Sequence, residues 1–211
     1  MIRLVADSSC DVYTLPGVDF RAVPLHISTD DGRAFIDDPE LNVREMVDCL
    51  HSYKGRSYTA CPSVAAWLEA FEGADTVYVV TITSGLSGSY NSAKVAADLY
   101  QQASPEASVH VFDSLSTGPE ELLLLEKLRE LVNTGLEFEE VIRQAEDYMR
   151  HTRLFFSLHS LHNLAQNGRI GKVTAAAVSV MNIRVIGTAS PEGTLATIGK
   201  ARGDKRAESV I

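Results

Sequence analysis

The sequence has no long apolar run and few cysteines, and both shortages restrict the class of protein. No stretch approaches the roughly 20 apolar residues of a membrane-spanning helix, and no charged-then-apolar leader opens the chain. The cysteines are Cys10, Cys49 and Cys61, an odd number without metal-ligand spacing, so we expect reduced thiols. We therefore expect a cytoplasmic protein without stable membrane insertion.

Motifs for nucleotide and metal binding are missing as well. Neither G-x-G-x-x-G nor the P-loop pattern occurs, so we expect no nucleotide cofactor. Gly85-Leu-Ser-Gly88 differs from the G-x-S-x-G nucleophile elbow in its glycine spacing. His159 and His162 have no carboxylate or thiol at ligand spacing, so we expect no metal site. Cys10 is a candidate nucleophile without a nearby histidine, and a small buried thiol is the favoured interpretation.

The net charge of −9 is unevenly distributed along the 211 residues. A negative total disfavours nucleic acid as a partner. Residues 1–167 carry 25 acidic and 12 basic side chains, whereas residues 168–211 carry 3 acidic and 7 basic ones. The basic set is Arg169, Lys172, Arg184, Lys200, Arg202, Lys205 and Arg206. Such a cluster is either an ordinary solvated face or a site for phosphate or for an acidic partner surface.

Strands and helices alternate in the first 150 residues. Apolar, β-branched runs predict strands at Ile2–Ala6, Ala22–Ile27, Val77–Ile82 and Val109–Phe112. Apolar residues at helical spacing predict helices at Val43–His51, Ser63–Phe71, Ser87–Gln102, Pro119–Asn133 and Phe138–Arg150. This alternation indicates an α/β fold, with residues 1–150 forming a three-layer domain whose parallel sheet is covered by helices on both faces.

The pattern changes near residue 151, where we expect a second domain to begin. Strands at Leu154–Leu158, Ile183–Gly187 and Leu195–Lys200, with helices at Leu161–Gln166 and Thr174–Met181, predict a two-layer α+β domain with a mixed sheet. Gly168 is typical of the residue that follows a helix end. A helical pattern from Arg202 reaches Ile211 without a C-cap, so we interpret residues 151–211 as the start of an incomplete domain.

A run of small hydroxylated residues follows the predicted strand Val77–Ile82 and is the most informative feature. It is Thr83-Ser-Gly-Leu-Ser-Gly-Ser-Tyr90, a turn that presents hydroxyls, backbone N–H groups and a helix N-terminus to one point. That combination holds an anion or a carboxylate, and ligands of open parallel sheets bind at such strand ends. We assign the site to the hydroxyls of Thr59 and Ser84. The alternatives are a Ser-rich N-cap and a Thr59 hydroxyl bonded to backbone.

Seven motifs, in order, resemble the DegV family of bacterial fatty-acid-binding proteins over essentially the whole chain. They are Asp7-Ser-Ser-Cys-Asp11, Val23-Pro-Leu-His-Ile27, Thr59-Ala-Cys-Pro-Ser63, Thr83-Ser-Gly-Leu-Ser-Gly-Ser-Tyr90, Asp113-Ser-Leu-Ser-Thr117, Asn167-Gly-Arg-Ile-Gly171 and Met181-Asn-Ile-Arg-Val185. The resemblance implies one long-chain fatty acid buried between two domains, with its carboxylate held by Thr59, Ser84 and the N–H of Gly85. It also implies a non-catalytic carrier that presents the carboxylate to a fatty acid kinase for acyl-phosphate formation in phospholipid synthesis.

Arg169 and Arg202 match arginines that face the kinase partner in the family, and tunnel-lining side chains are expected from Leu154–Phe156 and Ala175–Met181. The chain departs from the family at Gly118-Pro-Glu-Glu121, where a small glycine-rich stretch is usual. The family's later segment, which adds a histidine near the carboxylate, is not in this sequence.

Two other classes of function stay open. One is a Ser-based acyl hydrolase or phosphotransferase, with His26 as an available base. The other is a protein-interaction module with lipid as filler.

Overall fold

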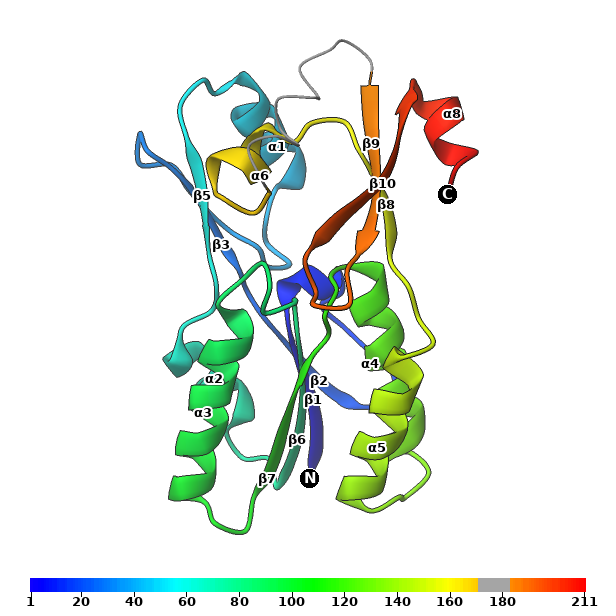
Figure 1. Ribbon diagram of the computed structural model, residues 1–211. Helices are drawn as coiled ribbons and strands as arrows, with labels where there is room; N and C mark the ends of the chain where they lie inside the picture. Colours follow the sequence, from blue (N-terminus) through cyan, green and yellow to red (C-terminus); the bar gives the residue numbers. More distant parts are fainter. Residues whose placement is uncertain (171–182) are drawn as a thin grey trace.

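A four-stranded parallel sheet organises the first part of the chain. The computed structural model describes residues 1–170 and 183–211. The strands are β1 (Ile2–Asp7), β2 (Asp19–Val23), β6 (Thr76–Thr81) and β7 (Ser108–Asp113). They lie in the order β2-β1-β6-β7, and each neighbouring pair is parallel (Figure 1). The carboxyl ends of the strands therefore share one edge of the sheet.

Helices cover both faces of this sheet. One face carries α2 (Val64–Phe71) and α3 (Ser89–Ala103), and the other carries α4 (Pro119–Val132) and α5 (Phe138–Met149) (Figure 1). Successive side chains of a strand point to opposite faces of its sheet. In β1, Leu4 therefore packs in the core under α4 and α5, whereas Val5 packs in the core under α2 and α3. The predicted α/β fold with a covered parallel sheet is confirmed. Among the described helices, none is long and apolar enough to cross a membrane.

The single strand predicted at Ala22–Ile27 is wrong, because the chain forms two strands there. β2 ends at Val23, and β3 (His26–Thr29) begins after Pro24 and Leu25. Pro24 has no N–H to continue the parallel ladder, so the chain leaves the sheet at this point. β3 then pairs antiparallel with β4 (Ala34–Ile36) and β5 (Ser57–Ala60) in a second sheet that the sequence analysis missed, with α1 (Val43–Ser52) between β4 and β5.

The last part of the chain adds a third sheet. Its strands are β8 (Phe155–Leu158), β9 (Ile183–Ala189) and β10 (Leu195–Arg202), and α8 (Asp204–Glu208) follows β10. The predicted hairpin forms between β9 and β10. The mixed pairing expected for this sheet is not found among these three described strands, all of which are antiparallel. The predicted helix Thr174–Met181 lies outside the described residues.

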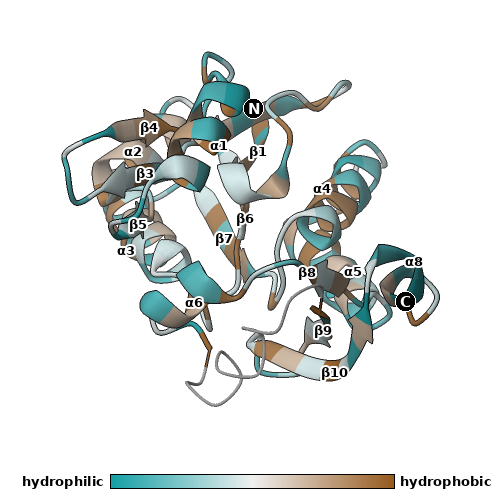
Figure 2. Ribbon diagram, turned by 90° about the horizontal axis from the view of Figure 1, so that it is seen from above, coloured by the Kyte–Doolittle hydropathy of each residue, from teal (hydrophilic) through white to brown (hydrophobic). Residues whose placement is uncertain are grey.

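The short helix α6 (His162–Gln166) ends as its sequence predicts. Gly168 has φ +73°, and its N–H donates to the carbonyl of Ala165 at 3.2 Å while the N–H of Arg169 donates to that of Leu164 at 2.9 Å. These two bonds form a Schellman motif, which turns the chain out of the helix. Viewed from above, α6 lies on the β5 side of the molecule, and the third sheet lies apart from it (Figure 2).

A buried arginine ties the first strand to its neighbours. Arg3 is only 3% exposed. Its Nε donates to Asp19 Oδ2 of β2 at 2.7 Å, and its Nη1 donates to the carbonyls of Ala70 and Glu72, at the end of α2, at 2.9 and 2.8 Å. The guanidinium therefore satisfies carbonyls that the last turn of α2 leaves without a partner.

We expect Arg3→Met to lower the free energy of unfolding by about 3 kcal/mol, because it leaves the buried carbonyl of Ala70 and the partly buried carbonyl of Glu72 unpaired and removes a charged hydrogen bond. Arg21→Met is the matched control on the adjacent strand, since Arg21 is exposed and donates to one carbonyl of the same helix. Its cost should stay below about 1 kcal/mol. Urea denaturation measures both variants, and equal losses would contradict the role given to Arg3.

Candidate functional site

The loops after β6 and β7 meet at the carboxyl edge of the parallel sheet. The Ser/Gly turn, residues 82–88, connects β6 to α3. Thr83 in this turn is buried, whereas Ser84 and Gly85 are exposed beside the N-terminus of α3. The N–H of Ser84 donates to Asp113 Oδ1 at 3.0 Å, which fastens the turn to the end of β7. The turn thus presents a hydroxyl at a helix N-terminus, where an anion is favoured.

The hydroxyl and the N–H predicted to hold a carboxylate differ in their present partners. Within the described part of the chain, the Ser84 hydroxyl forms no hydrogen bond to protein. The N–H of Gly85, by contrast, donates to Thr83 Oγ1 at 3.1 Å. A carboxylate would therefore find Ser84 available, whereas it would have to share the Gly85 N–H with Thr83.

Thr59 belongs to β5, where it is exposed and lies opposite Ile27 of β3. The chain that follows it packs against the start of α3, because Ser92 Oγ donates to the carbonyl of Pro62 at 2.8 Å. A Cβ at Gly88 would also lie 3.3 Å from Cys61 Sγ. These contacts bring the end of β5 to the same side of the molecule as the Ser/Gly turn, although no described contact joins Thr59 to Ser84 directly.

The hairpin turn between β9 and β10 docks onto the Ser/Gly turn (Figure 1). Thr83 Oγ1 donates to the carbonyl of Gly193 at 2.8 Å. A Cβ at Gly85 would lie 2.7 Å from that same carbonyl oxygen, and a Cβ at Gly193 would clash with Thr83 Oγ1 and lie 3.1 Å from the Cα of Leu115. Glycine is required at both positions because the two backbones approach closely.

The two arginines expected to face a partner occupy different places. Arg169 lies just after α6 and is half-buried, with its Nε donating to the carbonyl of Leu86 in the Ser/Gly turn at 3.3 Å. Arg202 is exposed and pairs with Ile183 in the hairpin, at the end away from Gly193. Arg169 is therefore part of the site, whereas Arg202 lies at a distance from it.

A cluster of buried carboxyl groups under the Ser/Gly turn was missed by the sequence analysis. Asp7, at the end of β1, and Glu121, in the first turn of α4, are both fully buried. Burial raises the pKa of Asp7, although hydrogen bonds from Ser89, Ser9 and Ile82 oppose the shift. Burial, together with the charge of Asp7, raises the pKa of Glu121 well above its ordinary value. Only the position of Asp7 at a strand end signalled this cluster.

Cys10 is the last residue of the short 3-10 turn η1 (Ser8–Cys10), which directly follows β1, and it is buried. Burial raises the pKa of its thiol to about 12, so the thiolate needed for nucleophilic attack is disfavoured. The preferred interpretation of Cys10 as a small buried thiol agrees with this environment. In residues 1–170 and 183–211, no group of three or more His, Cys, Asp or Glu side chains is placed to hold a metal ion.

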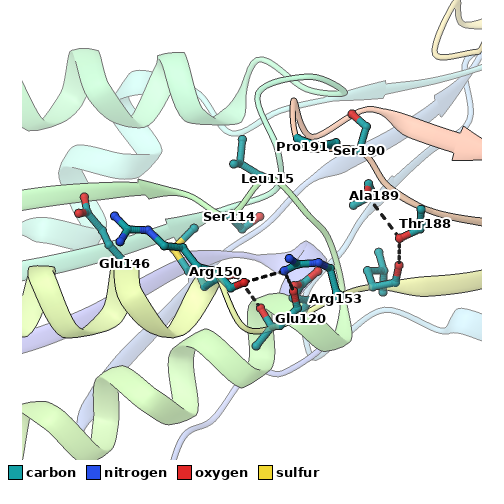
Figure 3. A pocket seen from close by; sticks show the side chains of 13 residues that line it. Ser114, Leu115, Glu120, Glu146, Arg150, Arg153, Thr188, Ala189, Ser190 and Pro191 are labelled. Carbon is teal, nitrogen blue, oxygen red and sulfur yellow. Dashed lines mark hydrogen bonds between the residues drawn. The ribbon is translucent and has the colours of Figure 1, made fainter.

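A cavity of about 550 Å³ lies between α5, the loop after β7 and the end of β9 (Figure 3). Its lining includes the apolar side chains of Leu115, Met149 and Leu154 and the charged residues Glu120 and Arg150. Leu154 comes from one of the stretches expected to line a lipid tunnel. Thr59, Ser84 and Gly85 are not among the lining residues, so the described chain does not trace a continuous tunnel from Ser84 to this cavity. The other expected lining stretch, Ala175–Met181, lies outside the described residues.

The covered parallel sheet, the Ser/Gly turn at a helix N-terminus and the docked third sheet define an α/β protein with a polar site at its strand ends. The chain belongs to the DegV family, because the family model, described as an uncharacterised protein of the DegV family, matches residues 1–211. A DegV domain-containing protein of Streptococcus pneumoniae is 43% identical over 208 residues, which cover 97% of this chain and 74% of that protein.

Two solved structures of relatives contain fatty acids. A DegV family protein from Eubacterium eligens, loaded with heptadecanoic acid, has 55% identity and a TM-score of 0.94 over 98% of this chain and 74% of that chain. The Fatty Acid Kinase (Fak) B3 protein of Streptococcus pneumoniae, loaded with linoleic acid, has 42% identity and a TM-score of 0.95 over 99% of this chain and 75% of that chain.

We expect Gly193→Ala to lower the free energy of unfolding by about 2–4 kcal/mol, because its Cβ would clash with Thr83 and its positive φ disfavours alanine. Gly135→Ala separates the two effects, since Gly135 has φ +76° but no atom of the described residues lies within 4 Å of an added Cβ. This control should cost only about 1 kcal/mol. Thermal and urea unfolding compare the pair, and equal costs would show that the docking contact is unimportant.

Proposed function

We propose that this protein binds a long-chain fatty acid between two structural units, residues 1–150 and residues 151–211. The first unit supplies the head-group site, in which the hydroxyls of Thr59 and Ser84 and the N–H of Gly85 hold the carboxylate. The second unit covers the acyl chain. The observation that carries this proposal is the exposed Ser84 hydroxyl, which has no hydrogen-bond partner in residues 1–170 and 183–211 and lies in the turn that leads into α3. The chain is 55% identical to a protein loaded with heptadecanoic acid.

Tail burial and head-group binding have different energetic roles in this proposal. Burial of a 16-carbon chain contributes on the order of 11 kcal/mol at about 0.8 kcal/mol per CH₂, before the cost of ordering the chain. Each head-group hydrogen bond contributes only about 1–3 kcal/mol. The apolar tail therefore supplies most of the affinity, and Ser84 and Thr59 determine where the carboxylate lies.

We further propose that the protein is a non-catalytic carrier in the cytoplasm that presents the carboxylate to a fatty acid kinase for acyl-phosphate formation. The likeness to the pneumococcal Fak B3 protein supports the kinase as partner. A hydrolase or phosphotransferase would need a base within hydrogen-bond reach of the nucleophile. Among the described residues no base is hydrogen-bonded to Ser84, and His26 lies in β3 opposite Ala60. No observation therefore favours the enzymatic alternative.

Arg169 and Arg202 are the proposed kinase contacts, and their surroundings suggest unequal roles. The Arg169 guanidinium is held by the carbonyls of Leu86 and Asn167, at 3.3 and 2.9 Å, so it also supports the Ser/Gly turn. Arg202 is exposed on β10 and is the cleaner probe of a partner surface.

Ser84→Ala should weaken fatty-acid binding about fivefold to 150-fold while leaving the fold intact, because one carboxylate hydrogen bond is lost and the tail contacts remain. Ser104→Ala, at the opposite end of α3, is the control and should bind as the parent does. Titration with cis-parinaric acid, a fluorescent long-chain fatty acid, measures affinity. Unchanged affinity in Ser84→Ala would count against the assigned site.

Arg202→Glu should lower the rate of acyl-phosphate formation by a bacterial fatty acid kinase with ATP about fivefold or more, because a charge at the rim of an interface governs association. Fatty-acid affinity should not change. Arg44→Glu, an equally exposed arginine on α1, is the control for net charge. If the two variants lose activity equally, Arg202 is not a specific contact.

A further inference from the structure

The buried carboxyl groups under the Ser/Gly turn form a chain of hydrogen bonds that starts at Glu121. Ser9 Oγ lies 2.8 Å from Glu121 Oε1 and also hydrogen-bonds to Asp7 Oδ1. The other oxygen of Asp7 accepts from the N–H of Ile82 at 3.1 Å and from the hydroxyl of Ser89. Ile82 is the first residue of the Ser/Gly turn and Ser89 directly follows it, so Asp7 holds both ends of this turn.

Counting hydrogens shows that one of the two carboxyl groups carries a proton. Ser9 has a single hydroxyl hydrogen, which cannot be donated to Asp7 and Glu121 at the same time. Two further hydrogen bonds, from Ile82 and Ser89 to Oδ2, stabilise the anion at Asp7, whereas Oε2 of Glu121 has no partner among the described residues. Ser9 therefore donates to Asp7, and its bond to Glu121 requires a hydrogen from Glu121.

The surroundings of Glu121 agree with a neutral acid. The side chain is fully buried, and its Oε2 has no hydrogen-bond partner among the described residues. An unpaired oxygen costs less in a neutral acid than in a carboxylate. The charged groups that act on Glu121 are Asp7 of β1 and Asp11 after η1, both acidic, and the thiol of Cys10 lies in η1. In the described chain, no cation forms an ion pair with Asp7 or Glu121.

We propose that Glu121 is a positioning residue, held as the neutral acid, whose proton directs the Ser9 hydroxyl onto Asp7 and so keeps the Ser84 turn in its carboxylate-binding shape. This role rests on the proposed fatty-acid function and adds a proton-dependent control of the same site. A second ionised carboxylate at Glu121 would repel Asp7 and reverse the Ser9 bond. Affinity for a fatty acid therefore falls as the pH rises through the pKa of Glu121, which burial has raised.

Infrared spectroscopy of the ligand-free protein tests the protonation state directly. The parent should show the C=O stretch of a protonated carboxylic acid at neutral pH. Glu121→Gln should remove this band, whereas Glu120→Gln, on the neighbouring and only half-buried residue, should leave it. Absence of the band in the parent, or its persistence in Glu121→Gln, overturns the proposal.

Titration with cis-parinaric acid from about pH 6 to about pH 10 tests the consequence for binding. In the parent, affinity should be constant while the infrared band persists and should fall, by up to about tenfold per pH unit, once the band disappears. If the band persists over the whole range, affinity should stay constant over it. Glu121→Gln should bind as well as the parent at neutral pH without that fall, because its amide N–H donates to Ser9. If the affinity of Glu121→Gln falls with rising pH as that of the parent does, the proposed role of the Glu121 proton is contradicted.

Asp7→Ala tests whether the turn is positioned, because it removes the oxygen that accepts from both Ile82 and Ser89. It should weaken binding about tenfold or more. Ser8→Ala is the matched structural control, since Ser8 is buried in the same 3-10 turn but bonds to Asp37 and to the N–H of Leu25. It should lose stability without losing affinity, and equal losses of affinity in the two variants overturn the positioning role.

Failure of the parent to bind cis-parinaric acid would instead refute the fatty-acid function, and the infrared result would still decide the protonation state of Glu121.

Discussion

The buried carboxylate of Asp7 is the constraint on which the rest of the site depends. A parallel sheet brings several strand ends to one edge, where backbone groups and helix N-termini need hydrogen-bond partners. Asp7 supplies acceptors to the end of β6 and to the start of α3. Because these partners lie on either side of the Ser/Gly turn, one anion in the sheet sets the path of the loop above it. The exposed face of that loop remains available for a second anion.

Much of the fold follows from sequence periodicity, and the errors have local causes. Alternating strands and helices predict the covered parallel sheet, and Gly168 predicts the end of α6. The β3–β5 sheet was missed because its strands are short and largely exposed, so they lack a strong apolar pattern. Pro24 was the available signal that the strand beginning before it could not continue.

The site was less predictable than the fold, because side-chain hydrogen bonds between distant residues leave no periodic trace. The Ser/Gly turn signalled an anion site, but nothing in the spacing of Asp7, Ser9 and Glu121 indicated that they meet. Gly118-Pro-Glu-Glu121 replaces the small glycine-rich stretch of the family and adds two carboxyl groups after β7. In the structure Glu120 accepts from the hydroxyl of Ser116, and Glu121 turns inward toward Ser9. The departure from the family pattern is therefore accommodated beneath the turn.

The contact between the β9–β10 turn and the Ser/Gly turn is made by main-chain atoms and one threonine hydroxyl. This contact therefore places few restrictions on the size of the other side chains in the hairpin. Relatives that keep these two glycines and this threonine can exchange hairpin residues freely while the lobes retain their alignment. The hairpin side chains are thus able to diverge in evolution without disturbing how the β9–β10 turn and the Ser/Gly turn are joined.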